Sequence, residues 1–370
     1  MSSIRLGDSR EERVLEADYL RGIAILMVAA VHVFGNYPDM VTSGWLLWTA
    51  VALQVIARVA VPLFLLLSAF VLVRRYYGDF SAADFYRKRL RVLLGPYLAF
   101  SFLYIGVYGL LKGWPTPSGV LRALVMASSA EHLWFFRLIF QIYLLYPVLA
   151  ALYAWSERRK CSGLFLLAAL LLQVGASWAE SGASGPENPF WKDVRTFLLT
   201  TPQFIFYFVL GLWAGRNFTG LKQRLNASRP ILTAACCGLV LGFAALSASQ
   251  VIHGGPKGPA AVGEPVMFVS AMLLFYYFVS QPAGRGSRLL RVLRELGFYA
   301  YGIFLIHILF LGVLAKSLRR VHITADVPVF YPLLFISTVF LSYVGVWVLH
   351  RTPFSQILLS MPTFSKHKEI

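Results

Sequence analysis

The chain is too apolar for an ordinary soluble domain. Of its 370 residues, 58% are hydrophobic and 14% are charged, whereas about 25% of the residues of soluble domains are charged. The net charge of +17, from 34 Lys and Arg against 17 Asp and Glu, would favour nucleic-acid binding in a soluble protein. Here the basic residues mostly flank long apolar runs, which indicates a membrane protein without a nucleic-acid partner. The three cysteines predict no disulfide framework, and we predict no metal site.

Ten apolar segments approach or exceed the roughly 20 helical residues that cross a bilayer core. They therefore predict an all-α, polytopic membrane helix bundle of about ten transmembrane helices. The fifth and eighth are short, and the second is long enough to tilt or break near Pro62. The expected segments are 20–37, 46–73, 92–111, 133–155, 164–178, 197–214, 231–247, 266–280, 296–315 and 329–349.

Lys and Arg are unequally distributed between the alternate loops of this arrangement. With a cytoplasmic N-terminus, 23 of them lie on the cytoplasmic side and 8 on the outer side. An excess of basic residues marks the cytoplasmic side. We therefore predict that both termini are cytoplasmic, with a segment at 1–19, one transmembrane domain at 20–349 and a tail at 350–370.

The first segment carries two polar residues, Arg21 and His32, within YLRGIAILMVAAVH. On a helix, eleven steps place them within about 20° of the same face and ~16 Å apart along the axis. Arg21 is then expected at the cytoplasmic mouth and His32 near the membrane middle, while Gly22 lets another helix or a ligand approach. Ionisable residues at this depth are functional candidates, although a satisfied interhelical hydrogen bond is the simpler alternative.

Two further polar residues are expected near the depth of His32. Arg58, in RVAVPLFLLLSAF, lies about fifteen residues from the cytoplasmic end of its helix, or roughly 22 Å. Pro62 follows four residues later and frees the Arg58 carbonyl, which adds polar character at this depth. His307, in YGIFLIHILF, lies about 15 Å deep in its own helix. The two histidines and the arginine form a candidate catalytic group.

Two flanking stretches add candidates for binding. The basic run FYRKRLR is either a topology signal or a phosphate-binding element, because guanidinium groups bind phosphate through two parallel hydrogen bonds. EHLWFF enters the fourth segment from outside, with an arginine one turn in, as an interfacial anchor or as the acceptor side of a site. The candidates from the two stretches are Arg87, Lys88, Arg89, Arg91, Glu131, His132, Trp134 and Arg137.

Together these stretches resemble the acyltransferase-3 family of integral membrane O-acyltransferases. LEADYLRGIAILMVAAVH resembles its opening motif, an Arg or Lys separated from a His by ten residues. RVAVPLFLLLSAF, FYRKRLRVLLGPYL, HLWFFRLIFQIYLLYP and YAYGIFLIH resemble later elements of the family, in the same order. The departures from the usual residues are Ala17, Ala69, Ala300, Phe304 and Val92, the last in place of a second arginine.

The resemblance implies a cytoplasmic acyl-CoA co-substrate, no permanently bound cofactor, and a carbohydrate or lipid-linked glycan hydroxyl as acceptor at the outer face. Acetyl is the default acyl group, and a bulkier one such as succinyl is the alternative. His32 would act as general base, and Arg58 or His307 would stabilise the oxyanion. Arg21 and the basic run would hold CoA, and the stretch from Glu131 to Arg137 would face the acceptor. The expected location is the bacterial inner membrane, among its lipids.

Two other classes of protein fit parts of the pattern. A transporter or polysaccharide export protein also places His and Arg at mid-membrane, but it predicts internal symmetry, and the sequence has no internal repeat. A non-catalytic scaffold leaves the stripe of Arg21 and His32 unexplained. The oligomeric state is not predicted.

Overall fold

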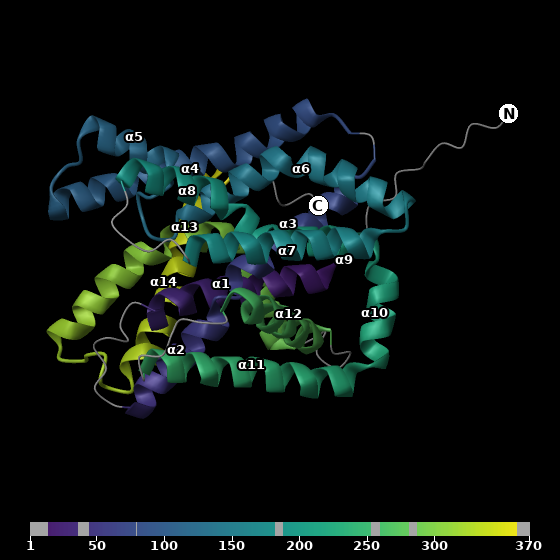
Figure 1. Ribbon diagram of the computed structural model, residues 1–370. Coiled ribbons are helices and arrows are strands. Elements are labelled where there is room, and N and C mark those ends of the chain that lie inside the picture. Colours follow the sequence, from purple (N-terminus) through teal and green to yellow (C-terminus); the bar gives the residue numbers. More distant parts are fainter. Residues whose placement is uncertain are drawn as a thin grey trace.

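The computed structural model describes residues 14–35, 44–78, 80–181, 188–252, 260–280 and 287–360. Within them all regular structure is helical, and most of the long helices lie side by side along one direction (Figure 1). The predicted cytoplasmic stretches 1–13 and 361–370 lie outside the described residues. The helices are α1 (Leu15–Gly35), α2 (Gly44–Ala57), α3 (Ala60–Arg75), α4 (Ala82–Lys112), α5 (Pro117–Val125), α6 (Trp134–Arg158), α7 (Ser162–Ser181), α8 (Pro189–Thr200), η2 (Pro202–Phe204), α9 (Ile205–Arg216), α10 (Phe218–Ala227), α11 (Arg229–Ile252), α12 (Ala260–Val279), α13 (Arg288–Arg320), α14 (Phe330–His350) and α15 (Ser355–Leu358).

The predicted polytopic helix bundle is confirmed. In the described part of the chain, nine spans are long and apolar enough to cross a membrane, with α2 and α3 counted as one span and α8 and α9 as another. The eighth predicted segment corresponds to α12, whose apolar stretch Gly263–Val279 is shorter than the nine, as expected. The second segment breaks at Arg58 and Val59, just before Pro62. The break places Pro62 in the first turn of α3, where its missing N–H costs no hydrogen bond within the helix.

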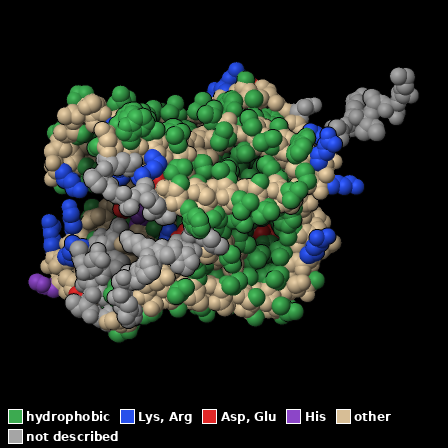
Figure 2. Space-filling view, viewed as in Figure 1, with side chains coloured by type: hydrophobic (Ala, Val, Ile, Leu, Met, Phe, Trp, Pro, Cys, Tyr) green, Lys and Arg blue, Asp and Glu red, His purple; other side chains and the backbone are tan. Residues whose placement is uncertain are grey.

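The surface of the bundle matches this arrangement. On the face in Figure 2, hydrophobic side chains cover the middle, and most Lys and Arg side chains lie toward the two ends of the bundle. The helix α10 runs across the long helices near one end (Figure 1). An apolar band between two charged ends is the surface that a bilayer requires.

Several helices begin at capping residues that the sequence supplies. The hydroxyl of Ser81 accepts from the Asp84 amide at the start of α4, and the hydroxyl of Ser287 accepts from the Leu290 amide at the start of α13. Such caps satisfy amides that have no partner within the helix. Both caps therefore fix where the helices that carry the basic run and His307 begin.

The closest backbone contact in the bundle's centre joins α1 to α13. A Cβ atom added to Gly22 would lie 2.0 Å from the Leu293 carbonyl oxygen, and one added to Gly297 would lie 2.2 Å from the Asp18 carbonyl oxygen. Ten residues further along each helix, the rings of His32 and His307 are 5.2 Å apart. The two helices are therefore parallel, and the glycines set their register.

We expect Gly22→Ala and Gly297→Ala each to destabilise the folded protein. The added methyl group meets backbone that cannot move aside, and overpacking of this kind costs about 1–3 kcal/mol. Thermal unfolding in detergent should show a lower Tm for both variants. Gly106→Ala in α4 is the matched control, because an added Cβ there meets nothing within 4 Å. A wild-type Tm for both Gly22→Ala and Gly297→Ala would contradict this close packing.

Candidate active site

Three histidines from three separate segments meet inside the bundle. His32 lies on α1, His307 on α13, and His132 in the turn that precedes α6. The ring centroids are 5.2 Å apart for His32 and His307, 5.0 Å for His132 and His307, and 6.4 Å for His32 and His132. His132 and His307 are buried, with 2% and 0% of their surface exposed. The structure therefore joins the first helix to the HLWFF stretch, which the sequence placed only near the outer face.

His32 is paired with a carboxylate. Its Nδ1 atom lies 3.3 Å from Oε1 of Glu131, and its side chain is 14% exposed. With the Nδ1 hydrogen directed at Glu131, the Nε2 atom carries the lone pair and can accept a proton. A carboxylate in this position orients the ring and stabilises the imidazolium that forms when Nε2 accepts that proton.

His307 is held by its own helix. Its Nδ1 atom lies 2.8 Å from the Phe304 carbonyl oxygen and 3.2 Å from that of Ile303. Because a carbonyl only accepts, Nδ1 carries the hydrogen, and Nε2 of the neutral ring is an acceptor. This Nε2 atom and both ring nitrogens of His132 are buried without a hydrogen-bond partner among the described residues. These nitrogens are therefore available to a bound substrate or to water.

An ion pair lies beside the histidines at the break between α2 and α3. The Nη2 atom of Arg58 is 2.7 Å from Oε1 of Glu264 on α12. Both residues line a cavity of about 280 Å³ with His32, His132 and Gln54. The sequence analysis identified Arg58 but not Glu264, although an acidic residue just inside an apolar segment is a signal for function.

A second cavity, of about 360 Å³, lies on the other side of two aromatic rings. Phe135 and Phe304 line both cavities, and their ring centroids are 5.6 Å apart. Arg21 and Asp18 line the second cavity, and Nη1 of Arg21 lies 2.8 Å from Oδ1 of Asp18. Arg21 and His32 therefore reach adjacent cavities on one side of α1, separated by the aromatic pair.

The basic run lies on α4 beside this second cavity, and its members face different ways. The Arg89 guanidinium stacks 5.7 Å from the ring of Tyr143, which lines the cavity together with Leu93, one turn beyond Arg89. Arg87, Lys88 and Arg91 are exposed. Of the four, Arg89 is the one that contacts a ring of the cavity wall, and it lies behind that ring without lining the cavity itself.

The two remaining acceptor-side candidates, Trp134 and Arg137, lie in different parts of the bundle. Trp134 lines the cavity that contains His32. Arg137 is buried elsewhere, where its Nη1 donates to the Met126 carbonyl at 2.7 Å and its Nη2 to the Thr200 hydroxyl at 3.0 Å. These two bonds tie α6 to the segments around α5 and α8, which gives Arg137 a structural role away from the histidines.

Metal binding finds no support in the described residues, where no group of three or more His, Cys, Asp or Glu side chains has suitable geometry. The geometry is compatible with general-base chemistry. His32, paired with Glu131, lines the first cavity together with Arg58, and Arg21 lines the second cavity beyond the aromatic pair. This combination suits the transfer of a group to a hydroxyl.

Comparison with known families identifies the chain. A family model described as an acyltransferase domain, Acyl_transf_3, matches residues 14–347. The chain belongs to the acyltransferase-3 family. The resemblance drawn from the five sequence motifs is thereby confirmed, and the nine candidate spans of the described residues agree with a multi-pass membrane protein.

One relative of this acyltransferase-3 protein is described as an enzyme of a different class, a racemase. An amino-acid racemase from Enterococcus faecalis is 25% identical over 170 residues, which are 45% of this chain and 22% of that protein. The chain therefore matches less than a quarter of the racemase, and the similarity assigns no racemase activity to it. No solved structure matches the chain.

Proposed function

We propose that this acyltransferase-3 protein moves a short acyl group, acetyl by default, from cytoplasmic acyl-CoA to a carbohydrate or glycoconjugate hydroxyl at the outer face of a bacterial inner membrane. The observation that carries the proposal is the pairing with Glu131 of His32, which lines one of two adjacent cavities. One cavity extends from Arg21 toward the aromatic pair of Phe135 and Phe304, and the other extends from that pair to the histidines.

The donor is expected in the cavity that Arg21 lines, beside Arg89. Guanidinium groups bind phosphate through charge-assisted hydrogen bonds, and both arginines lie on the side that the loop charges predict to be cytoplasmic. Acetyl stays the default acyl group of the proposal, and succinyl stays the bulkier alternative.

The reaction follows from the base. Nε2 of His32 removes the proton of the acceptor hydroxyl as the hydroxyl oxygen attacks the thioester carbonyl carbon. The tetrahedral intermediate then collapses, the bond from carbon to sulfur breaks, and the CoA thiolate takes the proton from the His32 imidazolium. Glu131 stabilises that imidazolium throughout.

Of the two candidates for stabilising the oxyanion, Arg58 has the better chemistry. Its guanidinium has five N–H donors, and the ion pair with Glu264 uses one nitrogen. Neutral His307 presents an acceptor nitrogen to the cluster, which repels an oxyanion and suits a substrate hydroxyl. We therefore assign Arg58 to the oxyanion and His307 to orienting the acceptor.

A transporter or export protein remains the second candidate function, supported by the same observation. A paired histidine and glutamate beside a cavity at membrane depth also suits a proton relay. The two functions differ in whether a covalent bond forms, so labelled acetyl-CoA and a candidate glycan distinguish them.

We expect His32→Asn to reduce acyl transfer by at least roughly 100-fold, because a positioned base contributes about 10²–10⁴-fold. The asparagine amide can still donate to Glu131 but cannot accept a proton. The matched control is His322→Asn on the exposed loop after α13, which should have wild-type turnover. Glu131→Gln should lower kcat by a smaller factor and leave KM unchanged. Wild-type kcat in His32→Asn would exclude it as the base.

Arg89→Gln should raise the KM for acyl-CoA by roughly tenfold, since a hydrogen bond to a charged group contributes about 1.5–3 kcal/mol. Lys88→Gln should raise the KM less, because that side chain is exposed. Arg158→Gln, an exposed arginine at the end of α6, is the control and should not change the KM. Equal effects at Arg89 and Lys88 would place the donor on the outside of α4 rather than in the cavity.

Sealed vesicles of known orientation test the sidedness of the reaction. Acyl-CoA should support transfer only from the cytoplasmic face, and an impermeant acceptor sugar should react only from the opposite face. The expected result is acylated sugar only when the two substrates are on opposite sides. Transfer with both substrates confined to the cytoplasmic side would contradict passage of the acyl group through the bundle.

A further inference from the structure

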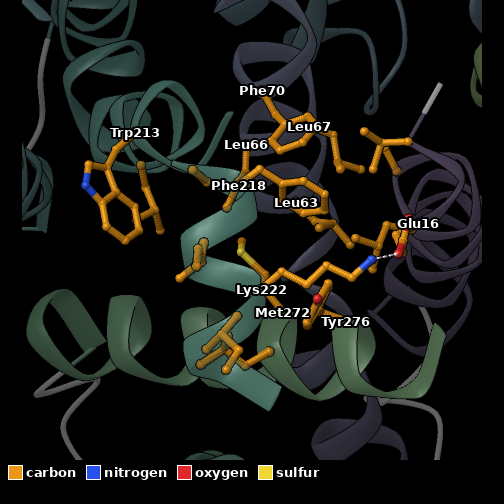
Figure 3. Close-up of a pocket in the computed structure, with 18 of the residues that line it drawn as sticks. Glu16, Leu63, Leu66, Leu67, Phe70, Trp213, Phe218, Lys222, Met272 and Tyr276 are labelled. Carbon is orange, nitrogen blue, oxygen red and sulfur yellow. Dashed lines mark hydrogen bonds and ion pairs between the residues drawn. The ribbon is translucent and has the colours of Figure 1, made fainter. Parts of the chain in front are cut away.

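A third cavity, of about 290 Å³, lies apart from the site and is lined by side chains of α1, α3, α9, α10 and α12. Its wall is almost entirely apolar, with Leu63, Leu67, Phe70, Trp213 and Met272 around it (Figure 3). Its volume is close to the lower end, about 300 Å³, of small-molecule pockets, so it matches part of a hydrocarbon chain rather than a whole lipid.

The cavity lies within one half of a bilayer. Leu63 lies twelve residues before Arg75, where α3 ends, and Val269 lies ten residues before the end of α12 at Val279. At 1.5 Å per residue these distances are about 18 Å and 15 Å. The hydrocarbon core of one leaflet is about 15 Å thick. The deepest lining residues therefore lie about one leaflet's thickness from the ends of these helices, and the lining itself extends over seven residues of each, or about 10 Å.

The polar groups of the cavity gather at its shallow end. Lys222 of α10 lies with its Nζ atom 2.7 Å from Oε1 of Glu16, near the start of α1 (Figure 3). Tyr276, near the end of α12, is 8% exposed, and its hydroxyl has no hydrogen-bond partner among the described residues. An unpaired buried hydroxyl costs about 1–3 kcal/mol. A ligand oxygen at this end would remove that cost.

The helix α10 covers this end of the cavity as an interfacial helix would. It runs across the ends of the long helices (Figure 1), and its side chains at positions 218, 221 and 225 line the cavity. That spacing is one face of a helix. An amphipathic helix in this position lies at the level of lipid headgroups.

We propose that this cavity binds one acyl tail of a bilayer phospholipid, with the lipid's glycerol and phosphate oxygens at Lys222 and Tyr276. The Lys222 ammonium has three donors and can serve Glu16 and a phosphate oxygen together. The acyl chain of the CoA donor fits less well, because none of the three clustered histidines lines this cavity. Leu67 is the one residue that the lining shares with the cavity of Arg21.

Photocrosslinking tests the proposal on the full-length protein in phosphatidylcholine vesicles. The probe is phosphatidylglycerol with a diazirine in one acyl tail, and the crosslinked residues are found by mass spectrometry. Adducts are expected on inward-facing residues of α9 and α12, such as Leu210 and Met272. Adducts confined to lipid-facing residues of these helices would overturn the proposal.

Variants that fill the cavity supply the matched comparison. Ala214→Phe and Leu273→Trp each place a large ring in it and should abolish the inward adducts. Ala151→Phe on the exposed face of α6 adds the same volume elsewhere and should retain them. Tm values show whether each variant folds. Two cavity-filling variants are used so that the test still holds if one of them does not fold. Retained inward adducts in a folded filler would exclude the cavity as their source.

Two further arms identify the ligand. Lys222→Gln should lose part of the inward labelling and keep the labelling of lipid-facing residues, and unchanged inward labelling would overturn the headgroup contact. A diazirine-tailed long-chain acyl-CoA, used in the same vesicles, should not label Leu210 or Met272. Labelling of these residues by acyl-CoA, with displacement of the phospholipid probe, would assign the cavity to the donor instead.

Discussion

The backbone contact between α1 and α13 at Gly22 and Gly297 sets the register on which the site depends. His32 and His307 each follow their glycine by ten residues, or about 15 Å of helix. In parallel helices joined at one level, equal offsets bring the two rings together. A side chain at either glycine would separate the helices and move the histidines apart. The packing of two small residues thus determines the geometry of a polar site deeper in the bundle.

Pairs of polar side chains also hold segments of the bundle together. Inside a bilayer, a charged side chain must find a partner within the protein or draw water inward. Arg58 pairs with Glu264, which joins the break between α2 and α3 to α12, and Glu131 pairs with His32, which joins the turn before α6 to α1. Each pair fixes two segments and leaves donors or acceptors directed into the same cavity. The residues that hold these segments together are therefore also the ones suited to act on a substrate.

Helical periodicity predicted where the helices lie in the sequence, but it did not predict which segments contact each other. It placed Arg21 and His32 on one side of α1 and put a break near Pro62, because both depend on local geometry. The same period could have singled out Arg89, which lies four residues before Leu93 on the inward face of α4. The contact of Glu131 with His32 and the burial of Arg137 against Met126 and Thr200 depend on how loops fold back. No periodic pattern in the sequence encodes that folding.

The aromatic pair between the two site cavities reconciles group transfer with an intact membrane. A protein that spans a bilayer cannot leave an open aqueous path between a cavity with Arg21 and a cavity with Arg58, because ions would follow it. Phe135 and Phe304 line both cavities, and their rings lie close enough to exclude water between them. In the proposed reaction only the uncharged thioester, its acyl group and its sulfur, has to reach His32, whereas the phosphates of CoA stay on the Arg21 side. The barrier that the rings form is therefore compatible with the chemistry, since the part of the donor that crosses it carries no charge.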